Sequence, residues 1–302
     1  MKKNTTVDQK KSVEQTEEQT VEQAEEQTVQ KTDNVPSNGE EKAADVVIIP
    51  EPPATRYPGI SVVIPYRADE ANGQELRFAL RSFEKNFKEP FHIVVIGDKE
   101  DWFDEENIIH IPFDSKDDNP QVNLIEILKI AIADERVTET FIWSNDDIYL
   151  LNEITTAHIA IPKALGKFEP EKYNGHYKSN MEKTIALLAE QGLPPVNYGT
   201  HTPFFFDKAK LQEMFEKFPE ALKGDCLFES LYYIGQFPII LDWLNDNWLL
   251  PIISSNPDPK QLQSFSEKKF FLNNNPRSYS PTLEKFLYER FPEMSRFEIE
   301  SR

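Results

Sequence analysis

The chain is poor in cysteine and glycine. Its 302 residues include a single cysteine, Cys226, and 10 glycines. One thiol cannot form an internal disulfide, and it cannot supply the several sulfur ligands that structural zinc sites typically use. The glycines form none of the P-loop, dinucleotide-binding or nucleophile-elbow motifs. The sequence therefore disfavours P-loop enzymes, Rossmann dehydrogenases and α/β-hydrolases, and the fold must be held by packing.

Long apolar runs and positive charge are also scarce. The longest runs, such as Ile60 to Pro65, are far shorter than the roughly 20 residues that span a bilayer. No apolar stretch follows Met1-Lys2-Lys3, as a signal peptide would require. The formal net charge is −19, whereas affinity for nucleic-acid phosphates comes from Lys and Arg. We therefore expect no integral membrane segment, no nucleic-acid partner and a cytoplasmic location.

Residues 1–55 contain no aromatic residue and are rich in acid. An eight-residue unit, Val13 to Thr20, recurs as Val21 to Thr28, with too few apolar positions for a coiled-coil seam. Such a segment cannot bury enough apolar surface to offset the entropy of ordering. The sequence therefore predicts a disordered acidic tail over 1–55, ending in a Pro-rich linker, and a folded domain over 56–302. A partner-binding or multimerising role for the tail is the alternative.

From Tyr57 onward, strand and helix patterns alternate. Apolar runs predict strands at 60–64, 91–96, 108–112 and 140–143, and amphipathic spacing predicts helices at 74–87, 122–133 and 208–218. This order predicts an α/β fold with a mostly parallel sheet flanked by helices. His92 and His110 fall within strands, so we expect them to be packing residues. Phe204 to Phe206 favours a further buried strand over a stacking platform.

Ligands of such sheets bind at the carboxyl ends of the strands. These ends carry Arg67, Asp98 and the run Asn145-Asp146-Asp147. Two carboxylates at the end of a buried strand suit hard cations such as Mg²⁺ or Mn²⁺. A turn in which an aspartate caps the next segment is the alternative reading.

Two arginines share one face of the first predicted helix. Arg77 and Arg81 are four residues apart and, with Arg67, could clamp phosphates. Ion pairing with Glu75 and Glu84 is the reading that the spacing favours.

His201 lies in an irregular stretch before the helix at 208–218. A histidine there suits a general acid or base, because its pKa is near neutral. A structural histidine is the alternative. The five histidines show no HExxH spacing, which argues against a zinc enzyme.

Several stretches, in order, resemble conserved regions of one family. They are Gln74 to Glu84 with Trp143 to Leu150, then His201 to Pro219, then Phe271 to Pro276 with Phe291 to Glu298. Together they resemble the Stealth proteins, which are sugar-1-phosphate transferases of capsular polysaccharide synthesis related to the lysosomal-enzyme N-acetylglucosamine phosphotransferase. The resemblance covers about residues 60–299.

The resemblance implies a GT-A-like transferase domain that uses a nucleotide-sugar donor, a glycan acceptor and Mg²⁺ or Mn²⁺. It implies metal binding by Asp146 and Asp147, and catalysis by His201 and Asp147. The donor-binding residues that we predict from strand ends and motifs together are Arg67, Arg77, Arg81, Asp98, Asn145 and Asn273.

The chain departs from the family pattern at three places. Ser61 to Arg67 is more similar to the opening strand of a GT-A glycosyltransferase. Ala221 to Asp225 lacks an arginine, so either Lys223 replaces it or the chemistry differs. Asn274 stands where the family often has aspartate.

Three functions therefore stay open. The leading hypothesis is sugar-1-phosphate transfer to a hydroxyl acceptor. The alternatives are a GT-A-type glycosyltransferase that releases nucleoside diphosphate, and an inactive transferase fold that serves as a binding module. Acceptor preference is expected in loops at 154–195 and 243–263, where Trp243 and Trp248 could stack on a sugar.

Overall fold

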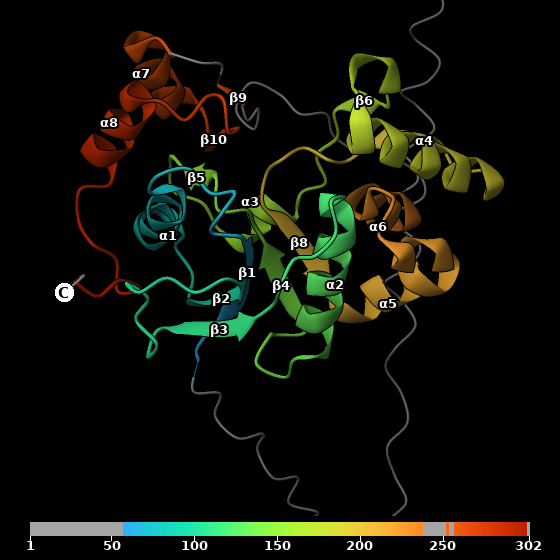
Figure 1. The fold of residues 1–302 in the computed structure, drawn as a ribbon, viewed down its shortest axis with the longest axis horizontal. Helices are drawn as coiled ribbons and strands as arrows, with labels where there is room; N and C mark the ends of the chain where they lie inside the picture. Colours follow the sequence, from blue (N-terminus) through green and yellow to red (C-terminus); the bar gives the residue numbers. More distant parts are fainter. Residues whose placement is uncertain (1–56, 238–251, 254–256, 301–302) are drawn as a thin grey trace, which may run out of the picture. The chain divides into compact units, whose positions relative to one another are not determined.

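A five-stranded sheet lies at the centre of the folded part of the chain (Figure 1). The computed structural model describes residues 57–237, 252–253 and 257–300. The predicted tail at 1–55 and the tryptophans Trp243 and Trp248 lie outside the described residues. The strands of the central sheet are β1 (Ile60–Tyr66), β2 (Phe91–Gly97), β3 (Ile108–Pro112), β4 (Thr140–Trp143) and β8 (Phe204–Asp207).

The strands stand in the order β3-β2-β1-β4-β8. The first four run parallel, and β8 pairs antiparallel with β4. The prediction of an α/β fold with a mostly parallel sheet is confirmed, as is the strand at Phe204 to Phe206. The order reverses at β1, because β2 lies on one side of it and β4 on the other. Open α/β sheets form a crevice at such a reversal.

The end of β1 is shaped by a proline and by a glycine of the next strand. Proline has no N–H to donate to a neighbouring strand. β4 pairs with β1 only as far as Val63, so Pro65 lies beyond that pairing and β1 continues to Tyr66. At the end of β2, a Cβ on Gly97 would lie 1.8 Å from the Tyr66 carbonyl oxygen. Glycine is therefore required where these two strand ends approach each other.

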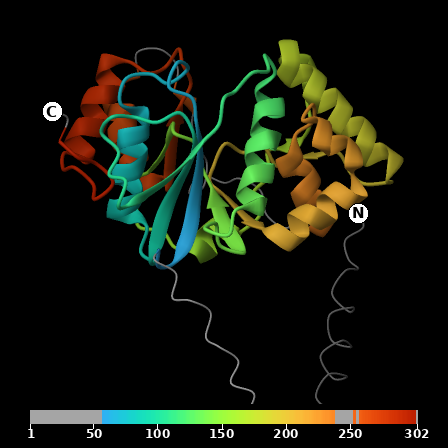
Figure 2. The same ribbon diagram turned by 60° about the horizontal axis from the view of Figure 1, so that its bottom comes forward.

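Helices cover both faces of the central sheet (Figures 1 and 2). Helix α1 (Glu75–Asn86) packs Leu76 and Leu80 on the face that carries Val62. The opposite face, which carries Val63, is covered by four helices. These are α2 (Pro120–Ala133), α4 (Gly175–Glu190), α5 (Lys208–Lys217) and α6 (Phe228–Gln236).

A second, smaller sheet packs against α1 from the other side. Its order is β5-β10-β9, and Phe78 of α1 shares a buried cluster with Tyr149 and Leu272 of this sheet. The elements of this layer are β5 (Ile148–Leu150), β9 (Ile252–Ile253), β10 (Phe271–Asn274), α7 (Pro259–Lys268) and α8 (Pro281–Arg290). Helix α1 is thus buried between two sheets.

The segment 154–195, expected to be a loop, contains regular structure. Its elements are α3 (Thr156–Ala160), β6 (Gly166–Lys167), the 3₁₀ turn η1 (Pro170–Lys172) and α4, and β6 pairs with β7 (Val196–Asn197). The expectation of a loop is wrong because Met181 and Leu188 of α4 are fully buried in the main core. Within the described ranges, we find no helix with the length and apolar character needed to cross a membrane.

Candidate functional site

A cleft of about 530 Å³ opens at the carboxyl ends of β1 and β4. Its lining includes Tyr66 at the end of β1, Arg67 directly after it, the turn Asn145 to Asp147 after β4, and Leu124 and Ile127 of α2. The cleft therefore occupies the point where the strand order reverses. Two of the strand ends that the sequence indicates meet here, and the end of β2 does not contribute to the lining.

Three carboxylates crowd the polar end of the cleft. Asp146 and Asp147 enter from the turn after β4, and Glu75 enters from the first turn of α1. Burial raises the pKa of Asp146, and the charges of Asp147 and Glu75 raise it further. Burial is also the main reason that the pKa of Glu75 is raised. A cation in the cleft would relieve this repulsion.

Glu75 is a site residue that sequence reasoning misses, because it counts Glu75 as an ion-pair partner of arginine. Its Oε2 accepts a hydrogen bond of 2.5 Å from the Asn72 backbone N–H, and its Oε1 accepts one from the Asn274 amide. Asn274 Oδ1 accepts in turn from the Tyr149 hydroxyl at 2.6 Å. Asn274 thus links a carboxylate to a tyrosine hydroxyl. The sequence feature that points to Glu75 is its position: it begins the helix that follows β1, so it lies near the carboxyl end of that strand.

His201 reaches the cleft from the loop before β8, in a left-handed backbone conformation. Its φ is 52°, and no other non-glycine residue among those described has a positive φ. This conformation costs about 1–2 kcal/mol. The loop holds it through bonds from the Gly199 N–H to Asn197 Oδ1 at 2.8 Å and between the Thr200 and Thr202 hydroxyls at 2.7 Å. Strain of this kind concentrates at functional sites.

One nitrogen of His201 faces two different partners. Nε2 lies 3.1 Å from Asn145 Nδ2 and 3.3 Å from Asp147 Oδ1. A neutral imidazole accepts at this nitrogen from the Asn145 amide, whereas an imidazolium donates from it to Asp147. The ring therefore has a hydrogen-bond partner in both protonation states. Its side chain is 35% exposed and lines the cleft.

A buried glutamate also acts on His201. Burial lowers the pKa of His201, but the hydrogen bond and charge of Asp147 and the charge of Glu229 outweigh this, so that the pKa is raised. Glu229 lies in the first turn of α6 and is 8% exposed. Burial raises the pKa of Glu229 to about 7. Sequence reasoning misses this residue because nothing in the local pattern separates it from a surface glutamate.

The other predicted donor-binding residues, Arg67, Asp98 and Asn273, lie at different distances from the cleft. Arg67 lines the cleft and pairs with Asp69 at 2.7 Å. Asp98 is outside the lining and accepts a 2.8 Å bond from the Ala68 N–H, which holds the loop after β1. Asn273 is fully buried in β10, and its amide has no hydrogen-bond partner among the described residues. Asn273 therefore does not line the cleft, in contrast to its predicted donor-binding role.

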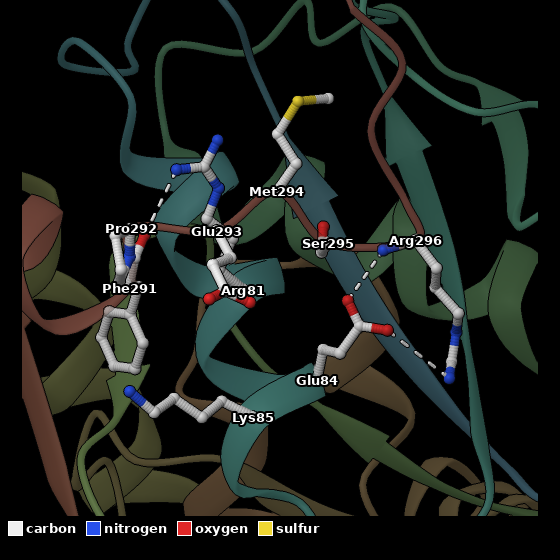
Figure 3. A pocket seen from close by; sticks show the side chains of 9 residues that line it. All are labelled: Arg81, Glu84, Lys85, Phe291, Pro292, Glu293, Met294, Ser295 and Arg296. Atoms are coloured by element: carbon white, nitrogen blue, oxygen red, sulfur yellow. Dashed lines mark hydrogen bonds and ion pairs between the residues drawn. The ribbon is translucent and has the colours of Figure 1, made fainter.

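Arg77 and Arg81 do not line the cleft, in contrast to their predicted donor-binding role. Two Arg81 nitrogens donate to Glu298 at 2.7 Å each, and Arg77 pairs with the same carboxylate at 3.5 Å. Arg81 also donates to the Phe291 carbonyl oxygen at 3.3 Å (Figure 3). The expected surface pairing with Glu75 and Glu84 is therefore wrong for Arg81, because its partner is the buried carboxylate of Glu298, 217 residues away in the sequence. The two arginines fasten α1 to the C-terminal segment.

The donor set at the acidic end fits one kind of metal site. In the part of the chain that the structure describes, no three His, Cys, Asp or Glu side chains are arranged to hold an ion. Asp146 and Asp147 therefore offer two carboxylates. Mg²⁺ is usually held by one or two carboxylates, with substrate phosphates and water completing its shell. The pair fits that mode and does not fit a closed protein cage.

Comparison with known proteins adds no family to this geometry. No family model matches the chain, and no curated protein matches it. The likeness to the Stealth motifs therefore rests on the quoted residues. The features of the structure that bear on function are the cleft, its acidic pair and His201.

Proposed function

We propose that the protein transfers a sugar-1-phosphate from a nucleotide-sugar donor to a hydroxyl group of a glycan, with Mg²⁺ or Mn²⁺ in the cleft. The observation that carries this proposal is His201, 3.3 Å from Asp147 at the strand-order reversal. Asp146 adds a second carboxylate beside it. A general base, a cation-binding pair and a cleft of nucleotide size are thus combined. A GT-A-like scaffold of Stealth type belongs to the same proposal.

His201 accepts the proton of the acceptor hydroxyl at Nε2. The acceptor oxygen forms a bond to the phosphorus that carries the sugar, and the bond from that phosphorus to the nucleoside monophosphate breaks. The acceptor hydroxyl displaces the Asn145 amide from the Nε2 lone pair, and Asp147 accepts a hydrogen bond from the imidazolium afterwards. When bound, the cation would neutralise the negative charge on the donor diphosphate.

The charges around the cleft support dependence on a cation. Arg67 is the one Lys or Arg among the described residues that line it. The carboxylates that line it are Glu70, Glu75, Asp118, Asp146 and Asp147. A bare diphosphate is repelled by this surface, so the donor binds together with its cation.

Glycosyl transfer is a second candidate, in which the acceptor attacks the anomeric carbon and nucleoside diphosphate leaves. The observation that favours it is the shortage of positive charge around the phosphates. Lys223, the residue that could replace the missing arginine, is exposed in the turn η2 (Pro219–Lys223) and does not line the cleft. Phosphoryl transfer therefore has Arg67 alone to support it.

Thermal unfolding of the full chain with uridine nucleotides and Mn²⁺ tests the site. At a ligand concentration about 100 times its Kd, binding adds about 2.7 kcal/mol to the free energy of unfolding. We expect this gain to require nucleotide and metal together, and to disappear in Asp147→Asn. The matched control is Asp114→Asn, whose side chain is 79% exposed away from the cleft. No gain with any nucleotide would instead favour a binding module without enzymatic activity.

A further inference from the structure

A second, smaller pocket adjoins the cleft at the end of β1. Its volume is about 240 Å³, and its lining includes Tyr66, Gln74, Arg77, Glu100 and Trp102. Tyr66 lines both hollows, and the loop from β1 to α1 contributes residues to each. The small pocket is less than half the volume of the cleft, so it has room for a single ring and none for a nucleotide.

The polar groups of this side pocket are balanced in charge. Arg77 supplies a cation, Glu100 an anion, and the amide of Gln74 both a donor and an acceptor. The Tyr66 hydroxyl donates to Glu100 Oε1 at 2.5 Å, which fixes the carboxylate in place. A phosphate is repelled by Glu100. Neutral hydroxyl groups, which both donate and accept, match this set of groups.

Packing holds the lining in position. The Arg77 guanidinium lies over the Trp102 ring, 4.4 Å from its centroid. The Gln74 backbone N–H donates to the Tyr279 hydroxyl at 3.1 Å, and a Cβ on Gly73 would lie 2.6 Å from the Tyr279 ring. The side-chain amide of Gln74 caps no helix N–H, and no hydrogen bond is found for it within the described residues. The pocket thus has a fixed frame and one polar group that is available to a ligand.

We propose that the side pocket binds a neutral pyranose of the acceptor glycan and holds it next to the cleft. This inference rests on the proposed function, because the donor fills the cleft and the acceptor must approach from its rim. The sugar of the donor has the same chemistry as the acceptor sugar. A change in the pocket distinguishes them: it raises the KM for the acceptor if the acceptor sugar binds there, and the KM for the donor if the donor sugar does.

The first test is transfer and hydrolysis by the full chain carrying Gln74→Ala. Loss of one hydrogen bond to a sugar hydroxyl raises the KM for the acceptor about tenfold. The KM for the donor, measured in its slow transfer to water, stays at the wild-type value. Gln261→Ala, an exposed glutamine of α7, is the matched control and behaves as wild type. An unchanged acceptor KM, or a donor KM that rises with it, overturns the proposal.

The second test does not depend on catalysis. Saturation-transfer NMR of the full chain uses methyl glycosides of neutral hexoses and N-acetylhexosamines as probes. We expect a signal from wild type and from Gln261→Ala, and its loss in Gln74→Ala. Glu100→Gln is a second pocket variant, for use if Gln74→Ala does not fold. It keeps an acceptor for the Tyr66 hydroxyl, and we expect it to weaken the signal. Absence of signal in wild type, or a signal that both pocket variants retain, overturns the proposal even where no donor is consumed.

Discussion

At His201, a single ring nitrogen lies within hydrogen-bond distance of an amide and of a carboxylate. Asn145 suits the neutral ring and Asp147 suits the charged one, at 3.1 and 3.3 Å. The left-handed backbone aims the ring at this pair. The ring therefore keeps a hydrogen-bond partner whether it is neutral or protonated.

His201→Ala is expected to lower kcat by at least about 100-fold, the usual contribution of a general base. Nucleotide affinity should be retained, because the base acts on the transition state more than on the bound donor. His201→Asn is the matched variant: asparagine tolerates the left-handed conformation but takes no proton at neutral pH. Steady-state kinetics measure kcat, and titration calorimetry measures the affinity for the nucleotide. Wild-type turnover in either variant would remove His201 from the mechanism.

Glu229 links stability to pH. Its pKa is about 7 in the folded chain, against an ordinary value of 4.5, because burial favours the neutral acid. The folded state holds this proton more tightly than the unfolded state. The stabilising contribution of Glu229 is therefore full below about pH 4.5 and is lost as the pH rises through 7.

Glu229→Gln stays neutral at every pH, so it should raise the free energy of unfolding by about 3 kcal/mol at pH 8 and change it little at pH 4. Urea denaturation at the two pH values measures this difference. Glu220→Gln, an exposed position in η2, is the control. An equal effect of Glu229→Gln at both pH values would contradict the raised pKa.

Helix α1 connects the cleft to the C-terminal segment. Its first turn carries Glu75 into the cleft, and Arg77 and Arg81 pair with Glu298, whose side chain is fully buried. The Ser295 N–H donates to the same carboxylate at 2.9 Å. The position of Glu75 therefore depends on an ion pair at the far end of the chain.

Glu298→Gln should lower the free energy of unfolding by about 3–5 kcal/mol, because it leaves the buried Arg81 guanidinium without a charged partner. Glu293→Gln lies on the same segment and is exposed, so it should change stability little. Chemical denaturation of the two variants gives the comparison. A loss below about 1 kcal/mol for Glu298→Gln would show that the pair does not hold α1 in place.

The elements that the sequence predicts before residue 220 lie within two residues of their observed bounds. Apolar runs and helical periodicity determine such elements locally. Strand order is not local, so the sequence could not show that the ends of β1 and β4 form the cleft without β2. The sequence pattern does not predict helix α4, because its buried residues, among them Met181, pack against elements remote in sequence.

The candidate site divides in the same way. His201 and Asp147, 54 residues apart, come together as the motifs and the strand-end rule indicate. Arg77 and Arg81 do not reach the cleft, because both pair with Glu298 near the C-terminus. Glu75 and Glu229 were missed because burial, which no local pattern reveals, gives them their roles.

Over the whole molecule, an acidic chain places its cleft where five carboxylates face one arginine. The proposed function requires this cleft to bind the nucleotide sugar together with a divalent cation, because carboxylates repel a bare diphosphate. The proposed function has three testable parts: dependence on a metal, a phosphorylated donor, and proton transfer to His201.

Identification of the nucleotide released by the full chain tests this account most directly. The protein is incubated with a panel of nucleotide sugars and glycan acceptors, with Mg²⁺ or Mn²⁺, and the products are separated by anion-exchange chromatography. Sugar-1-phosphate transfer predicts release of nucleoside monophosphate, which forms only with metal and is lost in Asp147→Asn. Release of nucleoside diphosphate would contradict sugar-1-phosphate transfer in favour of glycosyl transfer, and release of neither would contradict an enzymatic function for the cleft.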